Sequence, residues 1–174
     1  MGIDGQSPES GPAHAVYVDG FYIDALEVTL KQYLKFRTET LNTRRPSQPL
    51  NQFDPPEFPV LGVTYRDAQN FAHWAGKELP TEAEWEKAAR GPDGFEFPWG
   101  PGRAVWERDR QPGEIEPVGR HPNDRSVYGV LDVAGNAREW CSDWYAPDTY
   151  VQHHRTPDGS PPRNPTGPVK ANPV

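Results

Sequence analysis

The sequence predicts one loop-rich domain in which short helices and short strands alternate. Proline (21) and glycine (16) are spread along all 174 residues, so frequent turns must separate the elements. Three stretches have the spacing of helices, and one alternates as strands do. The hydrophobic fraction is only 34%, but 6 Trp, 7 Tyr and 7 Phe remove large apolar areas from water. We therefore expect a small aromatic core.

The N-terminal part of the chain contains the clearest strand pattern. Residues 16–28 alternate β-branched or aromatic residues with polar ones, and Asp19-Gly20 interrupts the alternation. This pattern predicts a strand, a turn and a second strand. A further short strand is expected at 115–118.

Two helices are predicted from apolar residues at helical spacing. The first spans about 29–39, and Thr29 can cap its free N–H groups. The second spans 67–75, with Asp67 as the expected N-cap and Gly76 as the expected stop.

A third helix begins at Thr81, because Thr81 and Glu84 form a Thr-x-x-Glu capping box, and it ends at Gly91. Proline and glycine are frequent in 40–59 and 92–126, and we expect surface loops there. Beyond Tyr145 large apolar residues almost disappear, so burial cannot offset the ordering entropy of the chain. We expect an extended tail over 146–174, mobile unless something packs on it.

Charge and hydropathy exclude two classes of partner. The net charge is −7 and no Lys/Arg-rich run exists, so neither nucleic acid nor an anionic membrane surface is an expected partner. No stretch approaches the roughly 20 apolar residues of a membrane span, and the first residues lack the pattern of a signal peptide. As written, the chain is expected to stay in the cytoplasm.

Four blocks of sequence together carry a specific resemblance. They read VDGFYIDALEVTLKQYLKF, PVLGVTYRDAQNFAHWAGKELPTEAEWEKAARG, FPWG and PVGRHPNDRSVYGVLDVAGNAREWCSDWY. In this order they resemble the formylglycine-generating-enzyme (sulfatase-modifying factor) family, and the resemblance extends from about Gly2 to Gly167. Secondary-structure propensity explains no block by itself.

The resemblance implies a loop-rich α+β fold related to C-type lectins. In the activating oxidases of this family, a C-terminal cysteine pair binds copper and uses oxygen to convert a sulfatase cysteine into formylglycine. That pair follows an RGGSW-like strand, whereas this chain runs from NPTGP into VKANPV. We therefore expect a partial domain over 1–145, with residues 146–174 leading toward a missing C-terminal part and the start also clipped. Copper is expected only in complete members.

The bend LDVAGNAREW holds the candidate metal ligands. Asp132 and Glu139 lie on either side of a bend around Gly135, and Ca²⁺ selects carboxylate and carbonyl oxygens. By resemblance to the family's structural calcium site, Asp132 and Glu139 supply side chains and Gly135 and Ala137 supply carbonyl oxygens. The alternative is structural: Asp132 caps the turn, and Glu139 pairs with a neighbouring arginine.

Other residues that chemistry could use have structural interpretations. Cys141, the single cysteine, is expected to be a buried inert thiol. Most tryptophans are expected in the core: Trp74, Trp85, Trp99, Trp140 and Trp144. Trp106 lies in a variable loop and is the better candidate for ligand contact.

These observations predict a sulfatase-modifying-factor domain that lacks the catalytic cysteine segment and is inactive alone, with no catalytic residue assigned. Two alternatives remain open. One is a non-catalytic, C-type-lectin-like module that binds a ligand, protein or peptide through loops 40–59 and 92–126. The other is a subunit that a partner chain completes, which would expose apolar surface and strand edges when alone.

Overall fold

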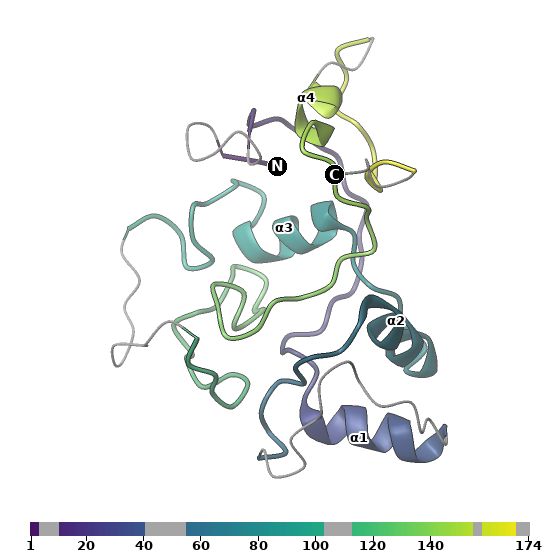
Figure 1. Ribbon diagram of the computed structural model, residues 1–174. Helices are drawn as coiled ribbons and strands as arrows, with labels where there is room; N and C mark the ends of the chain where they lie inside the picture. Colours follow the sequence, from purple (N-terminus) through teal and green to yellow (C-terminus); the bar gives the residue numbers. More distant parts are fainter. Residues whose placement is uncertain (4–10, 41–54, 103–112, 155–157, 170–174) are drawn as a thin grey trace.

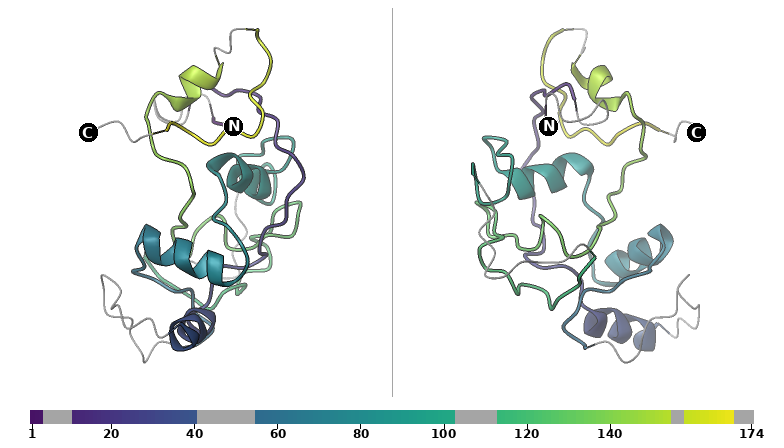
Figure 2. Two further views of the ribbon diagram at one scale, coloured as in Figure 1. Left: turned by 90° about the vertical axis from the view of Figure 1, so that its right-hand side faces the viewer. Right: turned by 60° about the vertical axis from the view of Figure 1, so that its left-hand side comes forward.

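The computed structural model describes residues 1–3, 11–40, 55–102, 113–154 and 158–169 (Figure 1). Its helices are α1 (Leu30–Glu39), α2 (Tyr65–Trp74), α3 (Glu82–Arg90) and α4 (Thr149–His154). α1 lies at one end of the molecule and α4 at the other, with α3 between them (Figures 1 and 2). Within the described ranges, no helix has both the length and the hydropathy that a membrane span requires.

Capping boxes start the three longer helices and confirm that all three exist. In each, a threonine side chain accepts from the backbone N–H three residues later, and the side chain of that later residue bonds back to the threonine N–H. The pairs are Thr29 with Gln32, Thr64 with Asp67 and Thr81 with Glu84. These reciprocal bonds satisfy N–H groups that have no partner inside the helix.

The predicted start of α2 was wrong. Thr64, not Asp67, is the N-cap, and Asp67 is the acid three residues into the capping box. The Asp67 carboxylate accepts from the Thr64 hydroxyl at 2.6 Å and from the Thr64 N–H at 3.2 Å. A pattern of Thr followed three residues later by Asp places the start one turn earlier than a lone Asp does.

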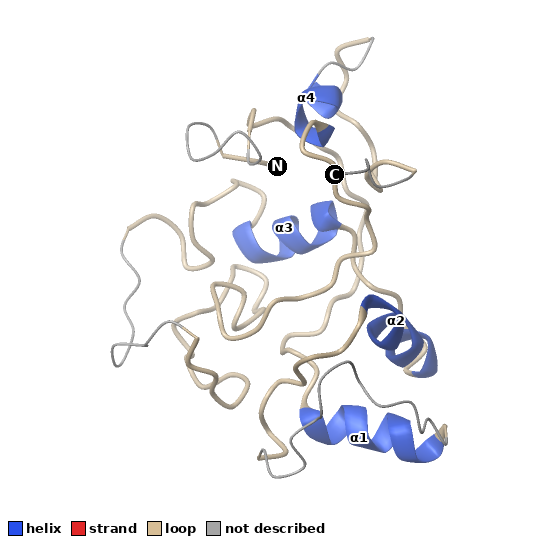
Figure 3. Cartoon of the chain, in the orientation of Figure 1, coloured by secondary structure: helices blue, strands red, loops and turns tan. Residues whose placement is uncertain are grey.

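The predicted hairpin over 16–28 is also wrong, because this stretch pairs with distant segments instead of with itself. Tyr17 forms an isolated parallel bridge with Arg163, and Thr29 forms an antiparallel bridge with Pro59. Between them, the carbonyl of Ala25 accepts from Leu131 N at 2.9 Å. Figure 3 accordingly draws helices and loops but no strand arrow in the described part of the chain.

The short strand expected at 115–118 does not form either. Val118 N donates to the Glu57 carbonyl at 3.0 Å, while Glu116 N donates to the Asn136 side chain at 2.9 Å. A side chain thus takes the place of a backbone partner, and no ladder develops.

An aromatic cluster joins α1 to α2 and confirms the small aromatic core. Phe36 of α1 meets Phe71 edge-on at 5.6 Å between ring centroids and Trp74 at 5.6 Å. Tyr33 lies 5.5 Å from Phe36 and 6.0 Å from Phe71. Phe36 is only 2% exposed, so it is the centre of this cluster.

The segment after Tyr145, expected to be extended, is in part helical and in part packed. Its first turns form α4, from which the buried Tyr150 reaches α3. Farther on, Asn164 N donates to the Tyr17 carbonyl at 2.7 Å, and the Arg163 guanidinium lies 4.5 Å from the centre of the Tyr17 ring. Hydrogen bonds to residues 17–19 therefore order the segment around Asn164, whose composition offers too little apolar burial to order it alone.

Two glycines that end helices allow a matched test of packing. Gly91 ends α3 at φ 72°, and a Cβ there would meet Val127 Cγ2 at 2.8 Å; Gly76 follows α2 at φ 71° with nothing within 4 Å. Positive φ alone costs an alanine roughly 1–2 kcal/mol. We expect Gly76→Ala to lose about 1 kcal/mol of unfolding free energy and Gly91→Ala about 2–3 kcal/mol. Urea titration measures both. Gly91 also has ψ −178°, which together with positive φ is a conformation almost limited to glycine, so equal losses would show that neither this ψ nor Val127 adds to the cost of positive φ.

Candidate functional site

The turn that holds the predicted calcium ligands has an unusual backbone. Asp132 and Asn136 both adopt positive φ, at 63° and 64°. Gly135 N donates to the Asp132 carbonyl at 3.1 Å, which closes the turn. Asn and Asp tolerate this left-handed conformation better than most residues, so the sequence is suited to so sharp a bend.

Asp132 is 3% exposed and is anchored to a neighbouring loop. Its Oδ2 accepts from Gly119 N at 2.5 Å. A buried carboxylate requires such partners, because removal from water disfavours its charge. The structural alternative, in which Asp132 caps its own turn, describes part of what this side chain does. Asp132 does accept a backbone N–H, but from Gly119 in the neighbouring loop.

Glu139 lies at the other end of the turn and faces α3. Its Oε2 accepts from the indole N–H of Trp85, not from an arginine as the structural interpretation expected. Burial first, and then the nearby charge of Asp132, raise the pKa of the Glu139 carboxyl above its ordinary value. The charge of one predicted side-chain ligand, Asp132, thus affects the ionisation of the other.

Glu27 is the residue that the sequence interpretation missed. Its Oε1 accepts from Ala137 N at 2.8 Å and its Oε2 accepts from Asn136 Nδ2 at 2.6 Å. Burial raises the pKa of Glu27 to about 7, with smaller contributions from the charges of Asp132 and Glu139. A single acid inside the apolar run ALEVTL was the signal that could have found it.

The donor set around this turn suits a hard cation. Glu27, Asp132 and Glu139 repel one another electrostatically, and oxygen ligands with negative charge are those that Ca²⁺ takes. Gly135 and Ala137 lie on the turn between the acids. No group of three or more His, Cys, Asp or Glu side chains in the described part of the chain is arranged as a metal site, so the candidate depends on backbone carbonyls as well.

A hollow of about 520 Å³ lies beside the turn, and we call it the apolar hollow. Its walls come from residues 21–28, from α2 and α3, and from 130–140. Aromatic and aliphatic side chains predominate, among them Phe21, Phe71, Trp85, Val130 and Trp140. Glu27, Ala137 and Glu139 also face it, so the candidate cation site and the apolar hollow share a wall.

Two tryptophans expected in the core are largely exposed. Trp140 is 47% and Trp144 59% exposed, although the Trp140 indole donates to the Val63 carbonyl at 3.1 Å. Trp85 and Trp99 are half-buried. The sequence correctly predicted aromatic packing within helices but not along 138–145, where no described segment covers the outer side chains. Trp106, and much of the two candidate ligand loops, lie outside the described residues.

Cys141 is half-buried beside the turn. Burial, and then the nearby acids Asp143, Glu82 and Glu139, raise the pKa of its thiol to about 12. The thiolate is the nucleophilic and metal-binding form, and the raised pKa favours the protonated thiol. The sequence interpretation expected a buried inert thiol, whereas the side chain is only half-buried.

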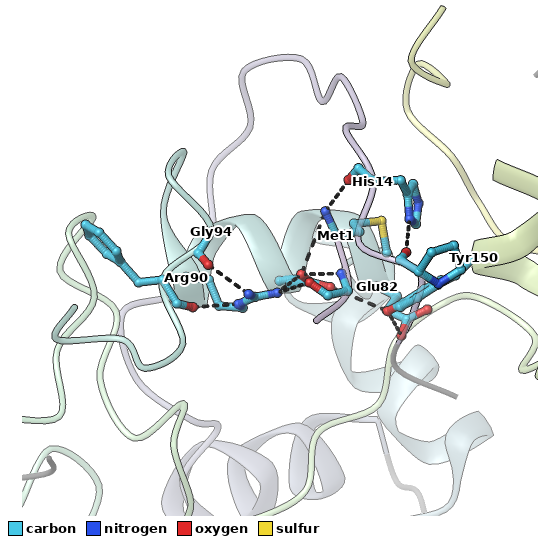
Figure 4. A network of polar contacts seen from close by, with 10 residues as sticks. Met1, His14, Glu82, Arg90, Gly94 and Tyr150 are labelled. Carbon is cyan, nitrogen blue, oxygen red and sulfur yellow. Dashed lines mark hydrogen bonds and ion pairs between the residues drawn. The ribbon is translucent and has the colours of Figure 1, made fainter. Parts of the chain in front are cut away.

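A second polar network connects α3 with α4 (Figure 4). The Tyr150 hydroxyl donates to Glu82 Oε1 at 2.8 Å, and the His14 ring meets Tyr150 edge-on at 5.2 Å. Burial raises the pKa of Glu82, and burial together with both nearby glutamates raises that of Tyr150. On the far side Arg90 donates to the Gly94 carbonyl at 2.8 Å. Each of these groups has a structural partner, so the network joins α4 and the first residues of the chain to α3.

Comparison with known proteins places this chain in a family. The model described as "Sulfatase-modifying factor enzyme 1-like domain" matches residues 1–167. This chain belongs to that family. PvdO from Pseudomonas aeruginosa has a similar structure, with a TM-score of 0.72 and 25% sequence identity over 98% of this chain and 74% of PvdO. The fold of the sulfatase-modifying-factor domain, with a few helices, is therefore shared.

Relatives of this sulfatase-modifying-factor domain have different names. It is 30% identical to the formylglycine-generating enzyme of Bos taurus over 86% of this chain and 56% of that enzyme. It is 34% identical to serine/threonine-protein kinase Pkn1 of Chlamydia trachomatis over 89% of this chain and 28% of that kinase. The chain thus spans about half of the bovine relative and about a quarter of the kinase.

Proposed function

We propose that this chain is a formylglycine-generating-enzyme-like domain that does not oxidise a sulfatase cysteine by itself. The observation that carries the proposal is its single cysteine, whose thiol has a pKa raised to about 12. The resemblance assigns the family's oxidation to a cysteine pair that binds copper. One protonated, half-buried thiol offers neither the pair nor the thiolate.

The finer description of the fold belongs to the same proposal: a loop-rich α+β domain of C-type-lectin type. The similarity to PvdO supports it, as do the bridges that join residues 17 and 29 to distant segments. A fold of this kind serves several functions, and the relatives of this domain include proteins named as a formylglycine-generating enzyme and as a serine/threonine-protein kinase. The activity must therefore be tested on the chain itself.

The direct test is incubation of the copper-loaded protein with a cysteine-containing sulfatase peptide. Mass spectrometry should detect no aldehyde, while the formylglycine-generating enzyme of Bos taurus, assayed in parallel, should convert the peptide. Aldehyde formation by this chain, lost in Cys141→Ser, would overturn the proposal and give Cys141 a catalytic role.

We also propose that the turn at 132–139 binds Ca²⁺, with Asp132 and Glu139 as side-chain ligands and the carbonyls of Gly135 and Ala137 as backbone ligands. The closeness of the buried acids supports it, because a cation offsets their repulsion. Its role would be structural: it would hold the bend.

Calcium should therefore raise the melting temperature. A ligand at 100 times its Kd stabilises the native state by about 2.7 kcal/mol, or roughly 5–11 °C for a chain of this size. Asp132→Ala and Glu139→Ala should abolish the shift, whereas Glu39→Ala, an exposed acid in α1, should preserve it. Differential scanning calorimetry with Ca²⁺ and with chelator measures the shift in melting temperature. The same shift in both site variants as in the parent protein would refute the assignment.

A second candidate function is a binding module, or a subunit that another chain completes. The apolar hollow and the exposed Trp140 and Trp144 favour it, since large exposed apolar surface is typical of interaction sites. A glycan and peptide array in the presence of Ca²⁺ tests the binding module, and binding above background is the expected result.

A further inference from the structure

Asn136 lies between the two residues whose carbonyl groups are proposed to bind calcium, Gly135 and Ala137. Its side chain bonds to both backbone groups of one residue: Glu116 N donates to Asn136 Oδ1 at 2.9 Å, and Asn136 Nδ2 donates to the Glu116 carbonyl at 3.2 Å. The same Nδ2 group donates to Glu27 Oε2 at 2.6 Å. One side-chain amide therefore joins the turn to segments that are 20 and 109 residues away in sequence.

The contacts of Asn136 use what an asparagine side chain offers. Its amide carries an acceptor oxygen and a nitrogen with two N–H groups, and here the oxygen accepts once while the nitrogen donates to two acceptors. Both partners are buried, Glu27 at 7% and Glu116 at 8% exposure, so they form a fixed frame. The backbone φ of 64° is also one that asparagine adopts more readily than most residues.

The place of Asn136 in the chain connects its side chain to the direction of the neighbouring carbonyls. The Gly135 carbonyl shares a planar peptide unit with the N–H of Asn136, so rotation about the φ of Asn136 turns that carbonyl. In the next peptide unit, Ala137 N donates to Glu27 Oε1 at 2.8 Å. The peptide units on both sides of Asn136 are therefore held, and with them the path of the chain into Ala137.

We propose that Asn136 is a positioning residue of the calcium site, whose side chain holds the turn so that the carbonyls of Gly135 and Ala137 converge before a cation binds. The proposal rests on the proposed calcium binding and adds to it a residue that is not a ligand. Groups that orient metal ligands usually change metal affinity by about 10–100-fold. A turn held in advance does not have to be ordered at the moment of binding.

Asn136→Gly separates positioning from a purely structural role. Glycine adopts the positive φ of this residue without steric cost, but it has no side chain to bond Glu27 or Glu116. We expect the Kd for Ca²⁺, measured by isothermal titration calorimetry on the full chain, to rise by about 10–100-fold. A folded variant with the Kd of the parent would overturn the proposal.

Asn164→Gly is the matched control. Asn164 also has positive φ, at 45°, and its side chain also forms two hydrogen bonds, both with Asp19: Nδ2 donates to Asp19 Oδ2 at 2.7 Å, and Oδ1 accepts from Asp19 N at 2.8 Å. Because Asn164 lies outside the turn, this variant should lose stability but keep the Kd of the parent for Ca²⁺. Equal rises in Kd for both glycine variants would show that lost stability alone weakens binding, which also contradicts the proposal.

Hydrogen exchange in the parent protein tests the proposal without a substitution. If the bonds of Asn136 favour calcium binding, calcium must favour those bonds in return. The amides of Glu116 and Ala137 should therefore exchange more slowly in Ca²⁺ than in chelator, by up to about 100-fold at 100 times the Kd. Asn164 N, which donates to the Tyr17 carbonyl, should slow by less. If calcium binds but slows neither turn amide beyond Asn164 N, Asn136 does not position the site.

These measurements distinguish failure of the positioning role from failure of calcium binding. If the parent gives no heat of binding and no calcium-dependent rise in melting temperature, the site at 132–139 is wrong and the role of Asn136 is refuted with it. If the parent binds calcium and Asn136→Gly binds as tightly, calcium binding stands and only the positioning role is refuted.

Discussion

Phe36→Ala is expected to remove about 3–5 kcal/mol of unfolding free energy, the usual cost of truncating a buried phenylalanine. Phe36 is 2% exposed and its ring contacts Tyr33, Phe71 and Trp74. Those rings come from both α1 and α2, so a cavity there would separate the two helices. A small core has little else to offset the loss.

Thermal unfolding followed by near-ultraviolet circular dichroism measures this effect, with an expected fall of roughly 6–20 °C in melting temperature. Lys35→Ala is the matched control on the adjacent residue of α1. Its ammonium is exposed, pairs with Glu39 at 3.3 Å and lies 5.4 Å from the Trp74 ring centre, contacts worth about 1 kcal/mol or less. Similar losses in both variants would show that the aromatic cluster does not stabilise the domain.

The helices could be predicted because their signals are local. A Thr-x-x-Glu box and apolar residues at helical spacing fix α3 within a few residues, and the helix follows them. The wrong N-cap of α2 is an error of the same local kind: Thr64 and Asp67 formed a box that a search for a single capping acid overlooked.

The strands could not be predicted because their partners are remote in sequence. Residues 16–28 alternate as a hairpin would, yet Tyr17 pairs with Arg163, and Ala25 accepts from Leu131. Alternation of polar and apolar residues shows which side chains share a face of a strand, but not which segment pairs with that strand. The exposure of Trp140 and Trp144 has the same origin, since burial along a non-helical segment depends on which segment covers it.

At the candidate site, the turn was found from its acids, whereas Glu27 was not. Glu27 is joined to Asn136 and Ala137 across about a hundred residues of sequence. Only the resemblance proposed the ligand set at 132–139, and no local pattern includes a carboxylate from so distant a segment. The electrostatics of the turn therefore had to come from the structure.

Glu27 should make the domain less stable as the pH rises from about 4.5 to 7. Its pKa is about 7 in the folded protein, above the ordinary glutamate value of 4.5, chiefly because burial disfavours the charge. Below pH 4.5 the carboxyl is protonated in both states. Between the two values the unfolded chain releases the proton while the folded protein keeps it, so the favourable contribution of the neutral carboxyl is lost as the pH passes 7. Because solvent screens part of the electrostatic effect, we expect the free energy of unfolding to fall by on the order of 1–2 kcal/mol.

Glu27→Gln should reduce the slope of the free energy of unfolding against pH between about 4.5 and 7. Glutamine keeps an oxygen for Ala137 N but brings a donor toward Asn136 Nδ2, so the variant should also lose about 1 kcal/mol at every pH. Chemical denaturation at pH values between 4 and 8 separates the constant loss from the slope. Glu39→Gln removes one acid of the same type from exposed α1 and controls for the change in net charge.

Calcium connects this slope to the proposed site. A cation held by Asp132 and Glu139 would favour the ionised form of the nearby Glu27, so the pKa of Glu27 should fall and stability should no longer decrease between pH 4.5 and 7. Denaturation of the parent protein in calcium and in chelator should then give different slopes, and the difference should shrink in Glu27→Gln. Equal slopes in the parent would mean that no cation binds near Glu27, whatever calcium does elsewhere.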